Sequence, residues 1–386
     1  MLQFNSIYNH KNFLRHFGLP NVIQFKGAWN NIDNIIQNDL PRYLVLDSFF
    51  KKANLHLKNV REIFYVSNEP SLEEVKNFLK LLPKEKIQII SVGGGSTLDF
   101  AKLVKGHRAF PGVNRIGYDF PRSKFETVLQ EEDELIALPT TVSAGSESSR
   151  YGLAFDNDGK KPQRAWCMVP ELVILDASFL ESFSNEQLLV QLFDSWTHAF
   201  EVQIASGESS KFVNRLVETN CKSISHFLQK INDSSPFSKD DLEEMQLCAF
   251  FAGNAISNVR TGALHTVGEA LASQDRTLRH IPSLYLAARN YHMLLGDYQG
   301  NMWRDETFLF EFWDMRMKEL AEFIKFLRSQ FNEQLMSLSS LDLLKLKFDV
   351  ESDNVLWEKE HPAIVSTINL TNYLNETIKK INEPGF

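Results

Sequence analysis

The chain has 386 residues, a formal net charge of -8 at pH 7 and three cysteines. This length predicts two or three domains, or two lobes that share a cleft. The acidic balance and the lack of a long basic run exclude nucleic acid and an anionic membrane surface as main partners. The odd, widely spaced cysteines argue against a disulfide framework, and no apolar run reaches 18 residues, so we expect a soluble cytoplasmic protein.

Short β-rich segments alternate with helical patterns over residues 1–180. This alternation predicts a parallel sheet with helices on both faces, so we expect a Rossmann-like α/β domain over residues 1–180. The expected strands span residues 21–25, 43–47, 63–67, 86–92, 134–138 and 172–176, with helical patterns at 71–82 and 96–105.

Beyond residue 180 the strand signals fade and apolar residues recur with the period of a helix, which predicts an all-helical domain over residues 181–386. The segment 306–331 is rich in Phe, Trp and Met, which indicates core or oligomer packing and leaves a homodimer open. The expected helices span residues 186–204, 211–231, 239–258, 281–295 and 306–331.

The predicted strand 43–47 ends in a carboxylate, Asp47. In nucleotide-binding α/β folds an acidic residue at this place accepts hydrogen bonds from the ribose hydroxyls and repels a 2′-phosphate. The alternative is that Asp47 caps the helix that follows.

A glycine-rich turn, Gly93-Gly94-Gly95-Ser96, joins the predicted strand 86–92 to the next helical pattern. Glycines let the backbone approach a ligand, and the helix N-terminus offers N–H groups and positive potential to a pyrophosphate. The spacing is not G-x-G-x-x-G, and a tight turn without a ligand is the alternative.

Hydroxyl groups and small residues crowd the segment 139–150 after the predicted strand 134–138. Thr140, Thr141 and Ser143 suit hydrogen bonds to the ribose and phosphates of a cofactor. The alternative is a solvated loop.

Asp194 and His198 are four residues apart in a helical pattern, so both side chains lie on one helix face. Two ligands on one face are half of a metal site, and His265 and His280 can supply the rest. The alternative is a hydrogen bond without a metal.

Taken together, the order and spacing of these groups resemble the iron-containing (group III) alcohol dehydrogenases, and they do so over about residues 21–280. Asn68 and Lys160 or Lys161 match further family positions. The groups are Gly93-Gly94-Gly95-Ser96-x-x-Asp99-x-x-Lys102, Pro139-Thr140-Thr141-x-x-x-Gly145-Ser146-Glu147, Asp194-x-x-x-His198-x-x-Glu201, and the pair His265 and His280.

The resemblance implies a dehydroquinate synthase-like fold, in which the α/β domain over residues 1–180 binds a nicotinamide dinucleotide, and a divalent metal held by Asp194, His198, His265 and His280. The charge of Asp47 beside the 2′ position predicts that NAD(H) is preferred over NADP(H). Such a metal acts as a Lewis acid on the alcohol, and this ligand set suits Fe²⁺ and Zn²⁺ equally. The expected cofactor-binding residues are Asp47, Asn68, Gly93, Gly94, Gly95, Ser96, Asp99, Thr140, Thr141, Ser143, Ser146, Lys160 and Lys161.

Three departures from the family pattern bear on the ligands. The loop before Gly145 reads Val142-Ser143-Ala144 where the family has Ala-Gly-Thr, which predicts an altered cofactor affinity. Glu269 replaces the family's second histidine, four residues after His265, and Ile281 replaces the usual glycine. We expect Glu269 and His265 to be the catalytic residues, and a polar substrate such as a sugar, sugar alcohol or related polyol.

The expected function is an NAD(P)-dependent, metal-containing alcohol dehydrogenase or aldehyde reductase of sugar metabolism, acting on a small-molecule alcohol or aldehyde. One alternative is a dehydroquinate-synthase-like cyclase whose use of NAD is redox-neutral. Another is a sugar oxidase of the 3-deoxy-octulosonate 8-oxidase type, which the run Glu147-Ser148-Ser149-Arg150 resembles. A binding protein without turnover is the third. The threonine-serine loop and the Asp-plus-three-His set favour the dehydrogenase.

Overall fold

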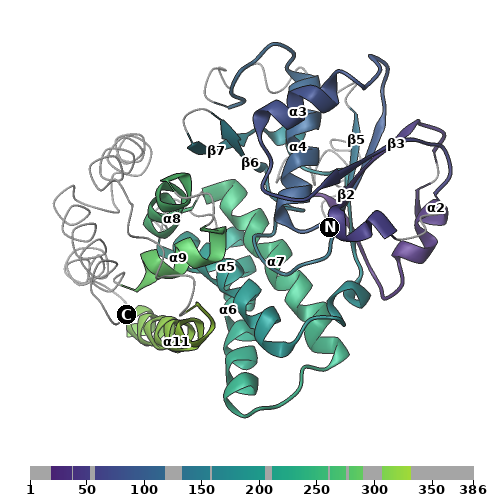
Figure 1. Cartoon of the computed structure of the whole chain (residues 1–386). Helices are drawn as coiled ribbons and strands as arrows, with labels where there is room; N and C mark the ends of the chain where they lie inside the picture. Colours follow the sequence, from purple (N-terminus) through teal and green to yellow (C-terminus); the bar gives the residue numbers. More distant parts are fainter. Residues whose placement is uncertain are drawn as a thin grey trace, which may run out of the picture. The chain divides into compact units, whose positions relative to one another are not determined.

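A computed structural model of the chain describes residues 19–36, 38–52, 57–117, 133–156, 159–204, 211–259, 261–274, 278–289 and 307–331. In these residues six strands form a fully parallel sheet in the order β1-β8-β5-β4-β2-β3. Two further strands, β6 and β7, form a separate antiparallel hairpin (Figure 1). This is the predicted α/β architecture, and all six predicted strands are confirmed.

The strands of the parallel sheet are β1 (Asn21–Gln24), β2 (Arg42–Asp47), β3 (Val60–Val66), β4 (Gln88–Gly93), β5 (Glu134–Pro139) and β8 (Leu172–Leu175). The hairpin strands are β6 (Tyr151–Asp156) and β7 (Gly159–Arg164). This hairpin was not predicted from the sequence. Pro162 interrupts the polar run of β7, and proline within a run argues against a central strand.

Helices follow the predicted strands and then dominate the chain. Segment 281–295 was predicted to be helical throughout, and the residues described there support a helix to Ala288. The helices are α2 (Ile32–Ile35), α3 (Leu72–Leu79), α4 (Gly95–Ala109), α5 (Asn185–Ile204), α6 (Lys211–Asn232), α7 (Lys239–Val259), α8 (Ala263–Gln274), α9 (His280–Ala288) and α11 (Thr307–Phe331).

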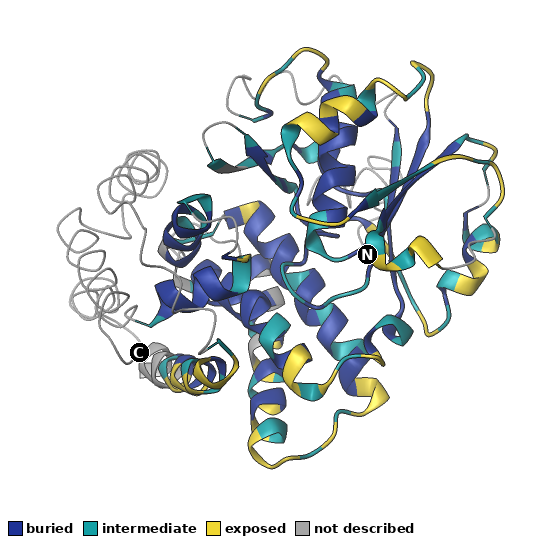
Figure 2. Cartoon of the chain, viewed as in Figure 1, coloured by how far each residue is buried: buried dark blue, intermediate teal, exposed yellow. Residues whose placement is uncertain are grey.

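Both faces of the parallel sheet are buried. Successive side chains of a strand point to opposite faces, so each strand contributes to two apolar clusters. In β2, Tyr43 and Val45 pack in one apolar cluster with residues of α3 and α4. Leu44 and Leu46 pack in a second cluster on the other face, with residues of α2 and the turn before it. Helix α4 is buried along most of its length, whereas α3 exposes one side to solvent (Figure 2). The sheet is thus packed on both faces, and the pairing of its strands fixes the relative positions of their carboxyl ends.

The chain divides into two compact units. The first unit comprises Met1–Ser195 and Phe237–Asn258, and the second comprises Trp196–Pro236 and Val259–Phe386. Helix α7 therefore packs with the α/β part. We predicted from the sequence that the chain forms two domains, residues 1–180 and 181–386. This domain boundary stays a prediction.

A backbone contact between two glycines fastens α7 within the first unit. A Cβ added to Gly253 of α7 would lie 1.9 Å from the carbonyl oxygen of Gly145. Gly145 has φ +66°, a left-handed conformation that favours glycine. The loop after β5 can therefore lie directly on the helix backbone only because both positions lack a side chain.

The second unit is held by apolar packing around a buried ion pair. Trp196 of α5 stacks on Phe200 at 4.8 Å between ring centroids and donates a 2.8 Å hydrogen bond from Nε1 to Glu319 of α11. Arg316 pairs with the same carboxylate, and Ser225 of α6 donates to it. These contacts join three helices at one carboxylate.

No described helix is long and apolar enough to cross a membrane.

Candidate cofactor and metal site

The carboxyl ends of three neighbouring strands bring separate sequence motifs together. Leu46 of β2 pairs with Val92 of β4, so Asp47 lies beside the start of the glycine turn. Gly93 pairs with Pro139 of β5, and Thr140 donates its backbone N–H to the Gly93 carbonyl oxygen at 3.0 Å. The strand order reverses at this place, since β3 lies on one side of β2 and β4 on the other. Ligands of open α/β sheets bind at such a switch point.

The glycine turn leaves the N-terminus of α4 accessible to a ligand. Gly94 is the N-cap residue without a side-chain hydrogen bond, and the first turn of the helix carries no acidic side chain. The first N–H groups of a helix have no partner within the helix, and they attract anions. A Cβ on Gly94 would lie 3.3 Å from Thr141, whereas one on Gly95 would meet nothing within 4 Å. This cradle fits a phosphate group.

The other predicted cofactor residues of the first unit lie at or near the same edge of the sheet. Asp47 is half-buried and accepts a 2.8 Å hydrogen bond from the backbone N–H of Phe49. This contact caps the short helix that follows, which was the alternative role predicted for Asp47. Asn68 is exposed just beyond the end of β3. The backbone of Lys160 and Lys161 lies in β7, opposite Phe155 and Ala154.

The loop after β5 is fastened by its own hydroxyl groups. Ser143 Oγ donates to Asp194 Oδ2 at 2.9 Å. Ser146 Oγ donates to the Asp99 carboxylate, which also lies 3.0 Å from Lys102 Nζ. The residues Asp99, Ser143 and Ser146, predicted to bind the cofactor, thus contact other protein groups in this structure.

Glu147, in the same loop, is a buried carboxyl group with 3 % exposure. Its Oε1 has no hydrogen-bond partner. Burial raises the pKa of Glu147 to about 7, although its own backbone N–H and the Lys102 ammonium oppose the rise. The protonation state of this loop therefore changes near neutral pH.

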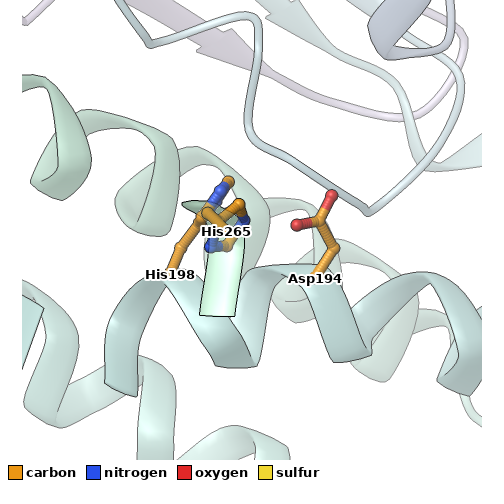
Figure 3. Close-up of side chains that lie close together, drawn as sticks. All are labelled: Asp194, His198 and His265. Carbon is orange, nitrogen blue, oxygen red and sulfur yellow. The ribbon is translucent and has the colours of Figure 1, made fainter. Parts of the chain in front are cut away.

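Asp194, His198 and His265 form a group whose possible metal-binding atoms all lie within 4.8 Å of one another. Asp194 and His198 project from the same continuous helix, α5, and His265 of α8 lies beside His198 (Figure 3). The two imidazole rings stack with centroids 4.4 Å apart. All three side chains are buried, at 0 %, 3 % and 2 % exposure. A buried carboxylate with two imidazoles is a donor set suited to a divalent transition metal.

Comparison with known proteins shows which proteins this chain is similar to. The family profile described as iron-containing alcohol dehydrogenase matches residues 20–177. The probable alcohol dehydrogenase EutG of Escherichia coli strain K12 is 31% identical over 199 residues, which cover 50% of this chain and 47% of that protein. The chain is thus similar to the iron-containing alcohol dehydrogenases over residues 20–177. The matched profile contains the strand ends and glycine turn, whereas the metal-binding candidates lie beyond it.

Two further similarities cover a larger part of the chain. The bifunctional aldehyde-alcohol dehydrogenase AdhE of the same strain is 25% identical over 300 residues, covering 70% of this chain and 32% of that protein. The chain thus spans about a third to a half of the length of these two curated relatives. The crystal structure of sulfoacetaldehyde reductase from Bifidobacterium kashiwanohense in complex with NAD+ shares the fold. It has a TM-score of 0.66 and 16% identity, covering 94% of this chain and 97% of that one.

His280 and Glu269 lie on the two helices next to the metal-binding candidates. His280 is the first residue of α9, and its ring centroid is 5.5 Å from that of His265. Its assignment as a fourth ligand stays a prediction. Glu269 is half-buried on α8, one turn after His265, and its backbone carbonyl accepts from Ser273 Oγ at 2.8 Å.

Glu201 belongs to one of the sequence motifs above but was not predicted to have a role. In the structure its carboxylate lies 2.6 Å from His265 Nδ1 and accepts a 2.7 Å hydrogen bond from the backbone N–H of Leu264. The spacing from Asp194 through His198 to Glu201 is i, i+4, i+7, which places all three on one helix face. That spacing is the signal by which Glu201 could have been found.

Proposed function

We propose that the chain is an NAD(H)-dependent dehydrogenase that transfers a hydride between nicotinamide and a polar alcohol or its aldehyde. The proposal includes a divalent metal held by Asp194, His198 and His265, with His280 as a further ligand. It rests chiefly on the buried Asp-His-His group, whose Asp194 is hydrogen-bonded to Ser143 of the hydroxyl-rich loop. The family relationship and the NAD+ complex of a structural relative support it.

The residues present fit both implied groups. The metal supplies Lewis acidity toward the substrate oxygen, and the nicotinamide ring accepts or returns the hydride. The first N–H groups of α4 bind the pyrophosphate, and Gly94 lets it approach the backbone. Asp47, the last residue of β2, would accept hydrogen bonds from the adenosine ribose hydroxyls. Ser143 orients the Asp194 carboxylate through its hydrogen bond.

Metal analysis and an NADH assay test this function. The purified chain should contain about one divalent ion and should change NADH absorbance with a polar alcohol or aldehyde. His265→Ala should lose the ion and the turnover, whereas His226→Ala, which changes an exposed histidine on α6, should keep both. Full activity in a metal-free sample would disprove the metal assignment. No hydride transfer from any alcohol would disprove the dehydrogenase.

The substrate is proposed to be a polyol, a sugar or a related polar alcohol because of Glu269. This half-buried carboxylate lies one turn after His265 on α8. A carboxylate accepts hydrogen bonds, so it can accept from a second hydroxyl of a polar substrate, which an aliphatic alcohol does not offer. Glu269→Gln should lower kcat/KM for such substrates by about tenfold, the value of one hydrogen bond to a charged group. If short aliphatic alcohols are the best substrates, the polar-substrate proposal is wrong.

A further inference from the structure

Glu201 connects helix α5 to the first turn of α8 through both of its carboxylate oxygens. Oε1 accepts the Leu264 backbone N–H at 2.7 Å, and Oε2 lies 2.6 Å from His265 Nδ1. The side chain is fully buried, at 0 % exposure, so water cannot readily replace either contact. One buried carboxylate therefore contacts both the backbone that begins α8 and the imidazole that follows it.

The contact with Nδ1 determines which nitrogen of His265 can bind a metal. A carboxylate accepts hydrogen bonds only, so Nδ1 carries the proton toward Glu201 Oε2. In that tautomer the lone pair lies on Nε2, on the opposite side of the ring. Metal-binding histidines commonly donate their second N–H to a carboxylate, which fixes the tautomer and the ring orientation.

Gly262 provides the space for the Glu201 carboxylate. A Cβ on Gly262 would lie 2.6 Å from Oε1 and 2.8 Å from Cδ of Glu201. Any larger residue at this position would displace the carboxylate from the start of α8. The geometry thus depends on a glycine two residues before Leu264.

We propose that Glu201 is a positioning residue, which holds His265 in the tautomer and orientation that bind a divalent cation. This inference rests on the proposed metal site and adds a residue that does not contact the metal. A purely structural role would be limited to capping α8 through Leu264 N. The two roles require different hydrogen bonds. The cap requires an acceptor facing Leu264 N, whereas the tautomer requires an acceptor facing His265 Nδ1.

Glu201→Gln separates these two roles. The glutamine carbonyl oxygen can still accept from Leu264 N and preserve the cap, but its NH₂ group then faces His265 Nδ1. An N–H donor there favours the tautomer with the proton on Nε2, and Nε2 then has no free lone pair for a metal. The helix therefore persists while the ligand is lost. Gly262→Ala displaces the carboxylate and should act in the same direction.

Co²⁺ titration of the metal-free full chain, followed by the visible ligand-field bands, measures the effect. Glu201→Gln should weaken Co²⁺ binding about 10- to 100-fold relative to wild type. Glu319→Gln is the matched control, because it changes another buried carboxylate of the second unit that contacts Trp196 and Arg316. It should lower Tm but leave the Co²⁺ affinity within about threefold, a range set by measurement error.

The outcomes distinguish this inference from the proposed function. If wild type binds Co²⁺ and Glu201→Gln binds it equally well, Glu201 does not position His265. Equal losses of affinity in Glu201→Gln and Glu319→Gln would show that affinity follows general stability, which also overturns the inference. A wild-type chain that binds no Co²⁺ would instead overturn the metal site as a whole.

Discussion

Ser143 Oγ donates a 2.9 Å hydrogen bond to Asp194 Oδ2, although 51 residues separate the two in sequence. This contact joins the hydroxyl-rich loop to α5, the helix that carries the metal-binding candidates Asp194 and His198. The same helix holds the loop at two further points, since Gln191 accepts from Val142 N at 3.0 Å and Ser195 donates to the Ser143 carbonyl oxygen. Ser143 is one of the departures from the family pattern, and in this chain its hydroxyl supports Asp194.

The Ser143→Ala variant should bind a divalent metal about tenfold more weakly, because Asp194 loses a hydrogen bond that orients its carboxylate. Ser143→Thr keeps the hydroxyl and serves as the control. Metal affinity and NAD(H) affinity are measured separately by titration. If Ser143→Ala weakens NAD(H) binding more than metal binding, the hydroxyl acts mainly on the cofactor.

Cofactor preference should depend on the charge of Asp47. Asp47→Asn keeps an oxygen that can accept from Phe49 N, so it preserves the cap while removing the charge beside the 2′ position. Wild type should prefer NAD(H), and the ratio of kcat/KM for NAD(H) over NADP(H) should fall at least about tenfold in the variant. Asp47→Gly, which also loses the cap, is the comparison. Equal use of both cofactors by wild type would contradict the prediction.

Stability should fall as pH rises through neutrality because of Glu147. Burial raises its folded-state pKa to about 7 from the ordinary 4.5, so its contribution is fully present below 4.5 and is lost as pH rises through about 7. Between pH 5 and pH 8 the loss should be roughly 2 to 3 kcal/mol. Glu147→Gln carries no titrating group and should lose less over this range.

Urea denaturation of wild type and Glu147→Gln at several pH values checks this slope. Glu62→Gln, which changes an exposed residue of β3, should behave as wild type. Parallel stability curves for wild type and Glu147→Gln would mean that the Glu147 carboxyl titrates alike in the folded and unfolded chain.

The Gly253→Ala substitution should destabilise the first unit by about 3 kcal/mol, because the added Cβ would overlap the Gly145 carbonyl oxygen and force α7 away from the loop. Gly95→Ala is the matched control, since its Cβ would meet nothing within 4 Å and alanine favours a helix. Urea midpoints of the two variants provide the comparison. Similar midpoints would show that the loop moves without cost.

Local patterns in the sequence predicted much of this protein. The alternation of short apolar runs with helical periods predicted the six parallel strands, because a strand buried on both faces needs a continuous apolar run. The spacing of Asp194 and His198 predicted a shared helix face, because four residues make about one helical turn. Such features depend only on neighbours along the chain. The β6–β7 hairpin was missed because Pro162 concealed its local pattern.

Contacts between residues far apart in the chain could not be predicted from local patterns. Glu201 and His265 are 64 residues apart, and no local period relates them. Their contact exists because α5 and α8 pack closely at Gly262, where a side chain would displace the carboxylate. Local sequence patterns therefore account for the helices and strands and for the residue types of the metal-binding candidates. Packing of these elements set the hydrogen-bond partners of the candidates, since burial makes each polar side chain dependent on the group placed against it.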